Sequence, residues 1–162
     1  MRKGIIIKDK LSVLTDDIRT GKTTKIFNWI EGKNVGGFLT PDVDGLRKFY
    51  DIHSGKYLAF ESEIASYLTV GVGRFNFYKS AFNYGNELII NSINSEFNYF
   101  IIDEFGKLEL QNMGFSTGID ELIKYLILND SAGEYMIVVR EFLVDDFLER
   151  YDLNVQEWLG FN

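Results

Sequence analysis

Two nearly unbroken apolar runs constrain the fold of this chain more than any other feature. Residues 97–104 read FNYFIIDE, and residues 134–140 read EYMIVVR. Strands that are apolar on both faces are typical of a parallel sheet covered by helices on both sides. Between the two runs, residues 116–130 have the spacing of an amphipathic helix, with Ser116 or Thr117 as the expected N-cap. The sequence therefore predicts a three-layer α/β/α fold with a mainly parallel sheet.

The first part of the chain combines a second strand and helix unit with a different pattern. KLSVLT at 10–15 predicts a strand, and GKTTKIFNWIEG at 21–32 predicts a helix after a loop. Over about residues 34–79, short β-type runs alternate with the turn sequences PDVDG and SGK. This region predicts an inserted antiparallel β-hairpin. The remaining expected elements are helices at 80–95 and 141–152 and a last strand at 154–158.

The loop before the first helix ends in Gly21, Lys22 and Thr23, which match the last three positions of the phosphate-loop pattern G-x-x-x-x-G-K-[ST]. In such a loop, backbone N–H groups and the helix N-terminus hold the phosphates, the lysine reaches the β- and γ-phosphate oxygens, and the hydroxyl binds Mg²⁺. Asp16 stands where the pattern has its first glycine. We expect Lys22 to assist catalysis and Thr23 to bind the metal. The expected nucleotide-binding residues are Thr20, Gly21, Lys22, Thr23 and Thr24.

The second half of the expected site is the carboxylate pair Asp103 and Glu104, at the end of the first apolar run. An aspartate at the end of a buried strand is placed as a Walker B carboxylate and can hold Mg²⁺ directly or through water. The adjacent glutamate can orient and deprotonate a water for in-line attack on the γ-phosphate. The alternative is that both carboxylates only solvate the end of a strand.

Three further residues are candidates for nucleotide binding. Gly106 and Lys107 follow the carboxylate pair, and Arg140 ends the second apolar run, where it can stabilise a γ-phosphate. The alternatives are a surface ion pair between Lys107 and Glu109 and a structural salt bridge between Arg140 and a neighbour such as Glu141.

The expected insertion contributes two arginines and many aromatic residues. Arg47 and Arg74 can approach a nucleotide, although we expect a solvated side chain for each. The aromatic residues between Phe49 and Phe82 can form a base-stacking platform. Aromatic residues that alternate along strands are more often core, and we favour that interpretation.

Charge and composition narrow the classes of partner. The formal net charge is −7 and the sequence pI is about 4.8, so the chain has no general attraction for nucleic acid or an anionic membrane. Cysteine is absent, which fits a reducing compartment, and no apolar run is long enough for a signal peptide or a membrane span. We expect a cytoplasmic protein in which residues 1–162 form a single domain. Nothing indicates an oligomeric state.

Five sequence blocks resemble a known family, the small P-loop nucleoside-triphosphatases first described from thermophiles, which include cancer-related nucleoside-triphosphatases. IIDEFGKLEL at 101–110 is similar to the family signature D-E-[IF]-G-[KP]-[ML]-E. The other blocks, in the family's order, are GKTT at 21–24, GGFLTPDV at 36–43, GLRKFYDI at 45–52 and VGRF at 72–75. The resemblance spans the chain from Leu11 to about Tyr151.

The resemblance implies a RecA-like P-loop fold with a hairpin inserted after the first helix. It also implies slow, Mg²⁺-dependent hydrolysis of ATP, GTP and other nucleoside triphosphates to diphosphates. Lys22 and Thr23 would be the phosphate and metal residues, Asp103 the Mg²⁺ carboxylate and Glu104 the catalytic base. Two alternatives follow from the altered loop and from the phosphate loop that kinases share. One is a nucleotide-binding or regulatory module without turnover, and the other is a phosphotransferase that acts on a small nucleoside or nucleotide.

Overall fold

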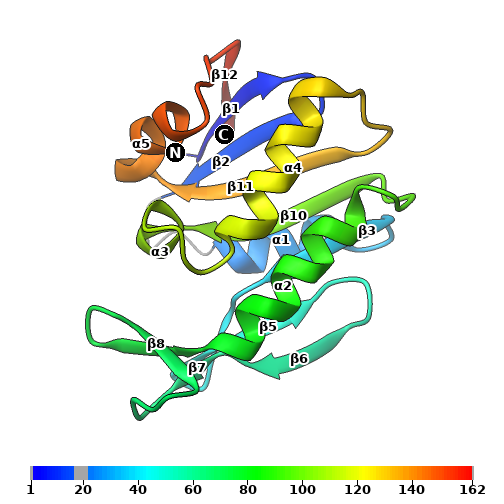
Figure 1. Ribbon diagram of the computed structural model, residues 1–162. Helices are drawn as coiled ribbons and strands as arrows, with labels where there is room; N and C mark the ends of the chain where they lie inside the picture. Colours follow the sequence, from blue (N-terminus) through cyan, green and yellow to red (C-terminus); the bar gives the residue numbers. More distant parts are fainter. Residues whose placement is uncertain (1, 17–21, 162) are drawn as a thin grey trace.

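The computed structural model describes residues 2–16 and 22–161 of the chain (Figure 1). A nine-stranded sheet forms its centre, in the order β12-β1-β2-β11-β10-β3-β5-β4, with β6 paired to β5. The four neighbouring strands β2, β11, β10 and β3 are parallel, and the strands on either side pair antiparallel. The strands are β1 (Arg2–Lys8), β2 (Leu11–Asp16), β3 (Val35–Leu39), β4 (Asp42–Val43), β5 (Leu46–Asp51), β6 (Lys56–Ala59), β10 (Tyr99–Phe105), β11 (Glu134–Arg140) and β12 (Glu157–Phe161).

Helices cover both faces of this sheet, as the apolar runs predicted (Figure 1). The helices are α1 (Lys22–Ile30), α2 (Lys79–Ser92), α3 (Lys107–Leu110), α4 (Ser116–Leu128) and α5 (Val144–Arg150), with a 3-10 turn at Glu141–Leu143 before α5. Ile101 of β10 packs with Ile26 of α1 on one face. Its neighbours Phe100 and Ile102 belong to the larger core on the opposite face, which includes residues of α2, α4 and α5. Side chains of β10 are thus buried on alternating sides, which confirms the three-layer α/β prediction.

The structure differs from the sequence prediction at the start of the expected insertion. The segment VGGFL, expected to open the antiparallel hairpin, is β3 of the central sheet and pairs parallel with β10. The antiparallel pairs of this region begin with β4. They continue in a separate three-stranded sheet of β7 (Glu61–Ser62), β9 (Phe75–Tyr78) and β8 (Thr69–Val72). The turn sequence PDVDG after VGGFL had suggested a hairpin, although the pairing of β3 is set by its contacts with β10.

Gly37 shows why β3 needs a glycine beside β10. Its φ is +97°, in the region that favours glycine, and a Cβ built there would lie 1.9 Å from the carbonyl oxygen of Ile101. The strand can approach β10 only because that position has no side chain.

Aromatic side chains join the inserted strands to the main core. Phe115, just before α4, contacts Phe38 of β3, Phe82 of α2, Phe49 of β5 and Phe60, which lies between β6 and β7. The ring centroids are 4.6 to 6.3 Å apart. All five rings are buried. The aromatic residues of the insertion therefore act largely as core, as the sequence favoured.

The N-terminus of α4 corrects the predicted cap. Ser116 is the first helical residue and is buried, and Phe115 occupies the N-cap position with no side-chain cap hydrogen bond. The Oδ1 atom of Asn86 accepts the Gly118 N–H at 2.8 Å, and a carboxylate oxygen of Glu109 accepts the Phe115 N–H at 2.9 Å. Asn86, from α2, therefore accepts an N–H group of the first turn that a local serine was expected to cap, and Glu109 accepts the N–H just before the helix.

The N-terminal strand and a short helix after β10 are among the elements that were not predicted. The N-terminal strand β1 lies between β2 and β12 and pairs antiparallel with both, and the short helix α3 follows β10. Across the described ranges, the helices are too short or too polar to cross a membrane.

Candidate active site

The expected site residues converge on the edge of the sheet where the parallel strands end. Asp16 closes β2, Arg140 closes β11 opposite Asp16, and Asp103 and Glu104 lie near the end of β10, the next strand along. Parallel strands bring their carboxyl ends to one edge, which is where open α/β sheets bind ligands. Residues separated by more than a hundred positions in sequence are therefore neighbours here.

Part of the expected phosphate loop lies outside the described residues. Thr20 and Gly21 belong to this undescribed segment, which follows Asp16 directly. The backbone of Lys22 and Thr23 forms the start of α1, and the next residue, Thr24, is exposed. The structure thus confirms the strand and the helix that flank the loop, and the roles of its side chains stay predictions.

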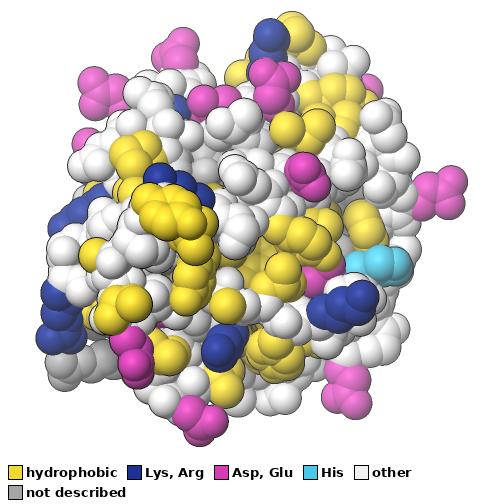
Figure 2. Space-filling model, turned by 60° about the horizontal axis from the view of Figure 1, so that its bottom comes forward, with side chains coloured by type: hydrophobic (Ala, Val, Ile, Leu, Met, Phe, Trp, Pro, Cys, Tyr) yellow, Lys and Arg dark blue, Asp and Glu magenta, His cyan; other side chains and the backbone are white. Residues whose placement is uncertain are grey.

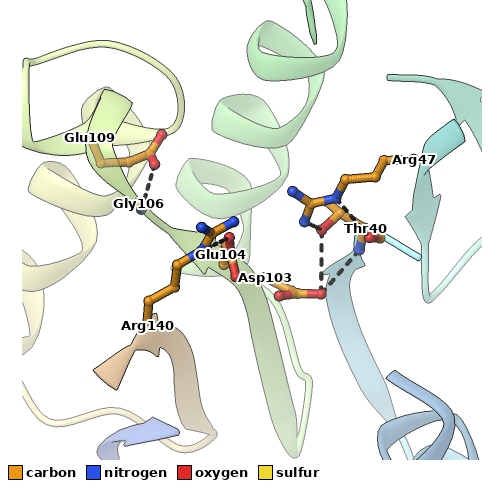
Figure 3. Close-up of polar contacts among 7 residues, drawn as sticks. All are labelled: Thr40, Arg47, Asp103, Glu104, Gly106, Glu109 and Arg140. Atoms are coloured by element: carbon orange, nitrogen blue, oxygen red, sulfur yellow. Dashed lines mark hydrogen bonds and ion pairs between the residues drawn. The ribbon is translucent and has the colours of Figure 1, made fainter. Parts of the chain in front are cut away.

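Asp103 is buried, with 2% of its surface exposed. Its Oδ2 atom accepts the Thr40 N–H at 3.1 Å and lies 3.5 Å from the Thr40 hydroxyl oxygen. Arg47 donates to that hydroxyl oxygen at 2.6 Å, so a chain of polar contacts runs from β5 through Thr40 to Asp103 (Figure 3). These contacts fix the carboxylate between β10 and β3.

Arg47 corrects one sequence expectation. We expected a solvated arginine, but its side chain is half-buried and holds Thr40 through both its Nε and Nη2 atoms. Arg74 is exposed as expected, with its guanidinium carbon 4.9 Å from the ring centroid of Phe75. Sequence reasoning did not single out Thr40, although it lies within the block GGFLTPDV, because its contact with Asp103 joins residues 63 positions apart.

Glu104 points away from Asp103 and toward Arg140 (Figure 3). Arg140 Nε donates to Glu104 Oε1 at 3.0 Å, and the Glu104 side chain is 14% exposed. The β10–β11 register shifts between Asp103 and Phe105, and such irregularities re-aim side chains at strand ends. Arg140 therefore forms an ion pair with Glu104, whereas the sequence had suggested Glu141 as its salt-bridge partner.

Glu109 is a buried carboxylate that the sequence interpretation placed at the surface. It is 4% exposed, and its two oxygens accept the backbone N–H groups of Gly106 at 2.7 Å and Phe115 at 2.9 Å. Burial raises the pKa of Glu109 to about 7, although its backbone hydrogen bonds act in the opposite direction. Because both oxygens accept backbone N–H groups, the alternative of a surface ion pair with Lys107 is not the role of this carboxylate. The glycine three residues before the glutamate was the available signal.

A cavity of about 250 Å³ opens beside Glu104 and Arg140. Gly106, Lys107 and Arg47 also line it, together with aromatic residues of the inserted strands. On the face that carries these strands, hydrophobic side chains gather and basic side chains lie among them (Figure 2). The site therefore combines cationic groups, carboxylates and an apolar wall.

The parallel strand order and the carboxylates at the strand ends define an α/β fold of the P-loop class. The structure is similar to the crystal structure of THEP1 from the hyperthermophile Aquifex aeolicus, with a TM-score of 0.61 and 23% sequence identity. The similarity covers 87% of this chain and 81% of that chain. No curated protein matches the chain.

A family model described as NTPase matches residues 12–155. The chain therefore belongs to the NTPase family, as the five sequence blocks indicated. Family membership and the fold support a nucleotide-binding function of the nucleoside-triphosphatase type.

Proposed function

We propose that the protein hydrolyses nucleoside triphosphates, including ATP and GTP, to the diphosphate and phosphate in a Mg²⁺-dependent reaction. The observation that carries the proposal is the pair of differently directed carboxylates at the end of β10. Asp103 is buried and fixed by Thr40, while Glu104 faces the cavity beside Arg140. This arrangement supports a metal-binding role for Asp103 and a water-activating role for Glu104.

The donor chemistry of the site fits Mg²⁺, a hard cation that prefers oxygen ligands. The residues that would hold it are Asp103, through its carboxylate, and Thr23, through its hydroxyl. When bound, the ion would neutralise negative charge on the phosphates. The Thr40 N–H holds the Asp103 carboxylate at the end of β10.

The remaining site residues would bind the phosphates or activate the water. The backbone N–H groups around Gly21, the start of α1 and the Lys22 ammonium would hold the phosphates, with Thr20 and Thr24 beside them. Glu104 would orient the attacking water and accept its proton. Arg140, held against Glu104, would add positive charge next to the γ-phosphate, and Gly106 and Lys107 would line the same edge.

The test is phosphate release from ATP and GTP with Mg²⁺, comparing the native protein with Glu104→Gln. We expect turnover to fall by about 100-fold or more, because loss of a general base typically costs 10²–10⁴ in rate. Glu121→Gln is the matched control, since Glu121 is exposed on α4 and does not line the cavity, and it should keep native turnover. Lys22→Ala should also lose turnover, through weaker phosphate binding.

Two outcomes would contradict the proposal. If Glu104→Gln turns over as fast as the native protein, this glutamate does not activate the water. If the native protein binds a triphosphate and releases no phosphate, the chain is a nucleotide-binding module without turnover.

A further inference from the structure

The cavity beside Glu104 has a wall that hydrolysis does not require. A hydrolytic water needs space for one small polar molecule beside the carboxylate. Here the cavity of about 250 Å³ extends to the inserted strands, where Phe60, Val72, Phe75 and Phe77 line it. Phe75 is 43% exposed, so part of this aromatic surface is open to a ligand. Apolar and aromatic walls of this kind are typical of sites for small organic molecules.

The charges that line the same cavity favour an anion. Four cationic side chains line it, namely Arg47, Arg74, Lys107 and Arg140, against the two carboxylates Glu104 and Glu109. Glu104 is paired with Arg140, and both oxygens of Glu109 accept backbone N–H groups. This local excess of positive charge occurs in a protein whose formal net charge is −7. Such a concentration of cations attracts phosphate or carboxylate groups.

The position of Glu104 separates this cavity from the base of the bound triphosphate. In an in-line displacement, the attacking group and the leaving diphosphate lie on opposite sides of the γ-phosphate. The base is joined to the leaving diphosphate, so it lies on the side away from Glu104. The cavity lies on the attacking side, because Glu104 itself lines it.

We propose that this cavity binds a second small molecule, a single aromatic ring that carries a phosphate group, at the same time as the nucleoside triphosphate. Pyrimidine nucleoside monophosphates are the representatives of this class. The ring contacts Phe75 and its aromatic neighbours, and its phosphate lies at Arg74, because Arg140 and Lys107 already serve the triphosphate. The proposal rests on the proposed function, because the assignment of the attacking side depends on Glu104 facing the γ-phosphate.

The test is calorimetric titration of CMP and UMP into the protein, first alone and then saturated with Mg²⁺ and a non-hydrolysable ATP analogue. Cytidine, which lacks the anion, and ribose 5-phosphate, which lacks the ring, are the matched ligands. We expect one monophosphate to bind per chain in the presence of the analogue. Each matched ligand should bind at least about tenfold more weakly than the monophosphate, since it loses either the charged hydrogen bonds or the stacking.

Variants locate the site. Arg74→Gln and Phe75→Ser should each weaken CMP binding by about tenfold, since each removes one charged or stacking contact. Both residues are exposed, so the variants are expected to fold, and circular dichroism checks this. The controls are Lys56→Gln and Tyr67→Ser, which remove a charge and an aromatic ring from exposed positions of the same insertion that do not line the cavity.

The outcomes separate this proposal from the proposed function. If the ATP analogue binds but neither CMP nor UMP does, the second site is wrong and the hydrolase proposal stands. If CMP binds only in competition with the analogue, it occupies the triphosphate's own site, which also overturns the inference. If the analogue does not bind, the proposed function fails, and CMP binding to the protein alone with loss in Arg74→Gln still supports a site for an aromatic phosphate.

Discussion

Replacement of Glu109 by glutamine should change how the stability of the protein depends on pH. Burial raises the pKa of this carboxyl to about 7 from its ordinary value of 4.5. The folded state therefore holds the proton more tightly than the unfolded chain does. The stabilisation from this proton is complete below pH 4.5 and is lost as the pH rises through about 7.

The size of the effect follows from the same two values. Between about pH 5.5 and about pH 8.5, proton linkage removes about 2 kcal/mol from the unfolding free energy of the native protein. Glu109→Gln cannot titrate, so it lacks this loss. The amide NH₂ must face one of the two backbone N–H groups that the carboxylate accepts, which destabilises the variant by about 1–3 kcal/mol at every pH.

The assay is urea unfolding of both proteins across this pH range, with the difference between their unfolding free energies as the readout. We expect the native protein to be more stable at about pH 5.5 and its advantage to shrink by about 2 kcal/mol at about pH 8.5. Glu87→Gln, at an exposed position of α2, is the control for an amide replacement outside the buried site. A difference between native protein and Glu109→Gln that stays constant with pH would refute the reasoning.

Two further predictions concern β3 and the residue that follows it. Gly37→Ala should lower the unfolding free energy by about 3 kcal/mol or more, because the new Cβ meets the Ile101 carbonyl and cannot be accommodated without moving β3. Gly45 also has a positive φ, +87°, but a Cβ built there has no heavy atom within 4 Å. Gly45→Ala should therefore lower the unfolding free energy by only about 1–2 kcal/mol, measured by thermal or urea unfolding of both variants. Equal losses in the two variants would contradict the packing argument. Thr40→Val keeps the hydrogen bond from the backbone N–H to Asp103 and removes the hydroxyl. The Mg²⁺ concentration for half-maximal phosphate release should therefore rise severalfold. An unchanged Mg²⁺ requirement would exclude this hydroxyl as a group that positions Asp103.

The candidate site shows where sequence reasoning works and where it stops. Asp103, Glu104 and Arg140 were recognisable because each ends a buried strand, and parallel strands bring such ends together. The ion pair between Glu104 and Arg140 was not predictable, since it depends on β10 lying next to β11 and on the register shift at Glu104. Thr40 was missed because its contact with Asp103 joins residues 63 positions apart.

The burial of Glu109 was likewise not predictable from the sequence. Glu109 lies two residues after the exposed Lys107, and a surface ion pair between them was one of the two alternatives that the sequence offered. In the fold, α3 turns it inward to the N–H groups of Gly106 and Phe115. Likewise, Asn86 and Glu109 satisfy N–H groups at the start of α4, where Ser116 or Thr117 had been expected. Side chains from other elements, and not the local serine or threonine, accept these N–H groups.

The sequence by itself determined the parts of this protein that depend on short stretches of chain. The apolar runs at 97–104 and 134–140 determined buried parallel strands, and the helical periodicities determined the layers that cover them. The five sequence blocks determined the family. These features are local because hydrophobic periodicity follows from backbone geometry over a few residues.

Only the tertiary structure decided which side chains meet. It placed β3 in the central sheet instead of a hairpin, fixed Asp103 through Thr40 and Arg47, and joined an aromatic wall of the insertion to the carboxylates of β10. Each of these arrangements depends on contacts between segments distant in sequence. Strand order and packing specify such contacts, and no short stretch of the chain carries that information.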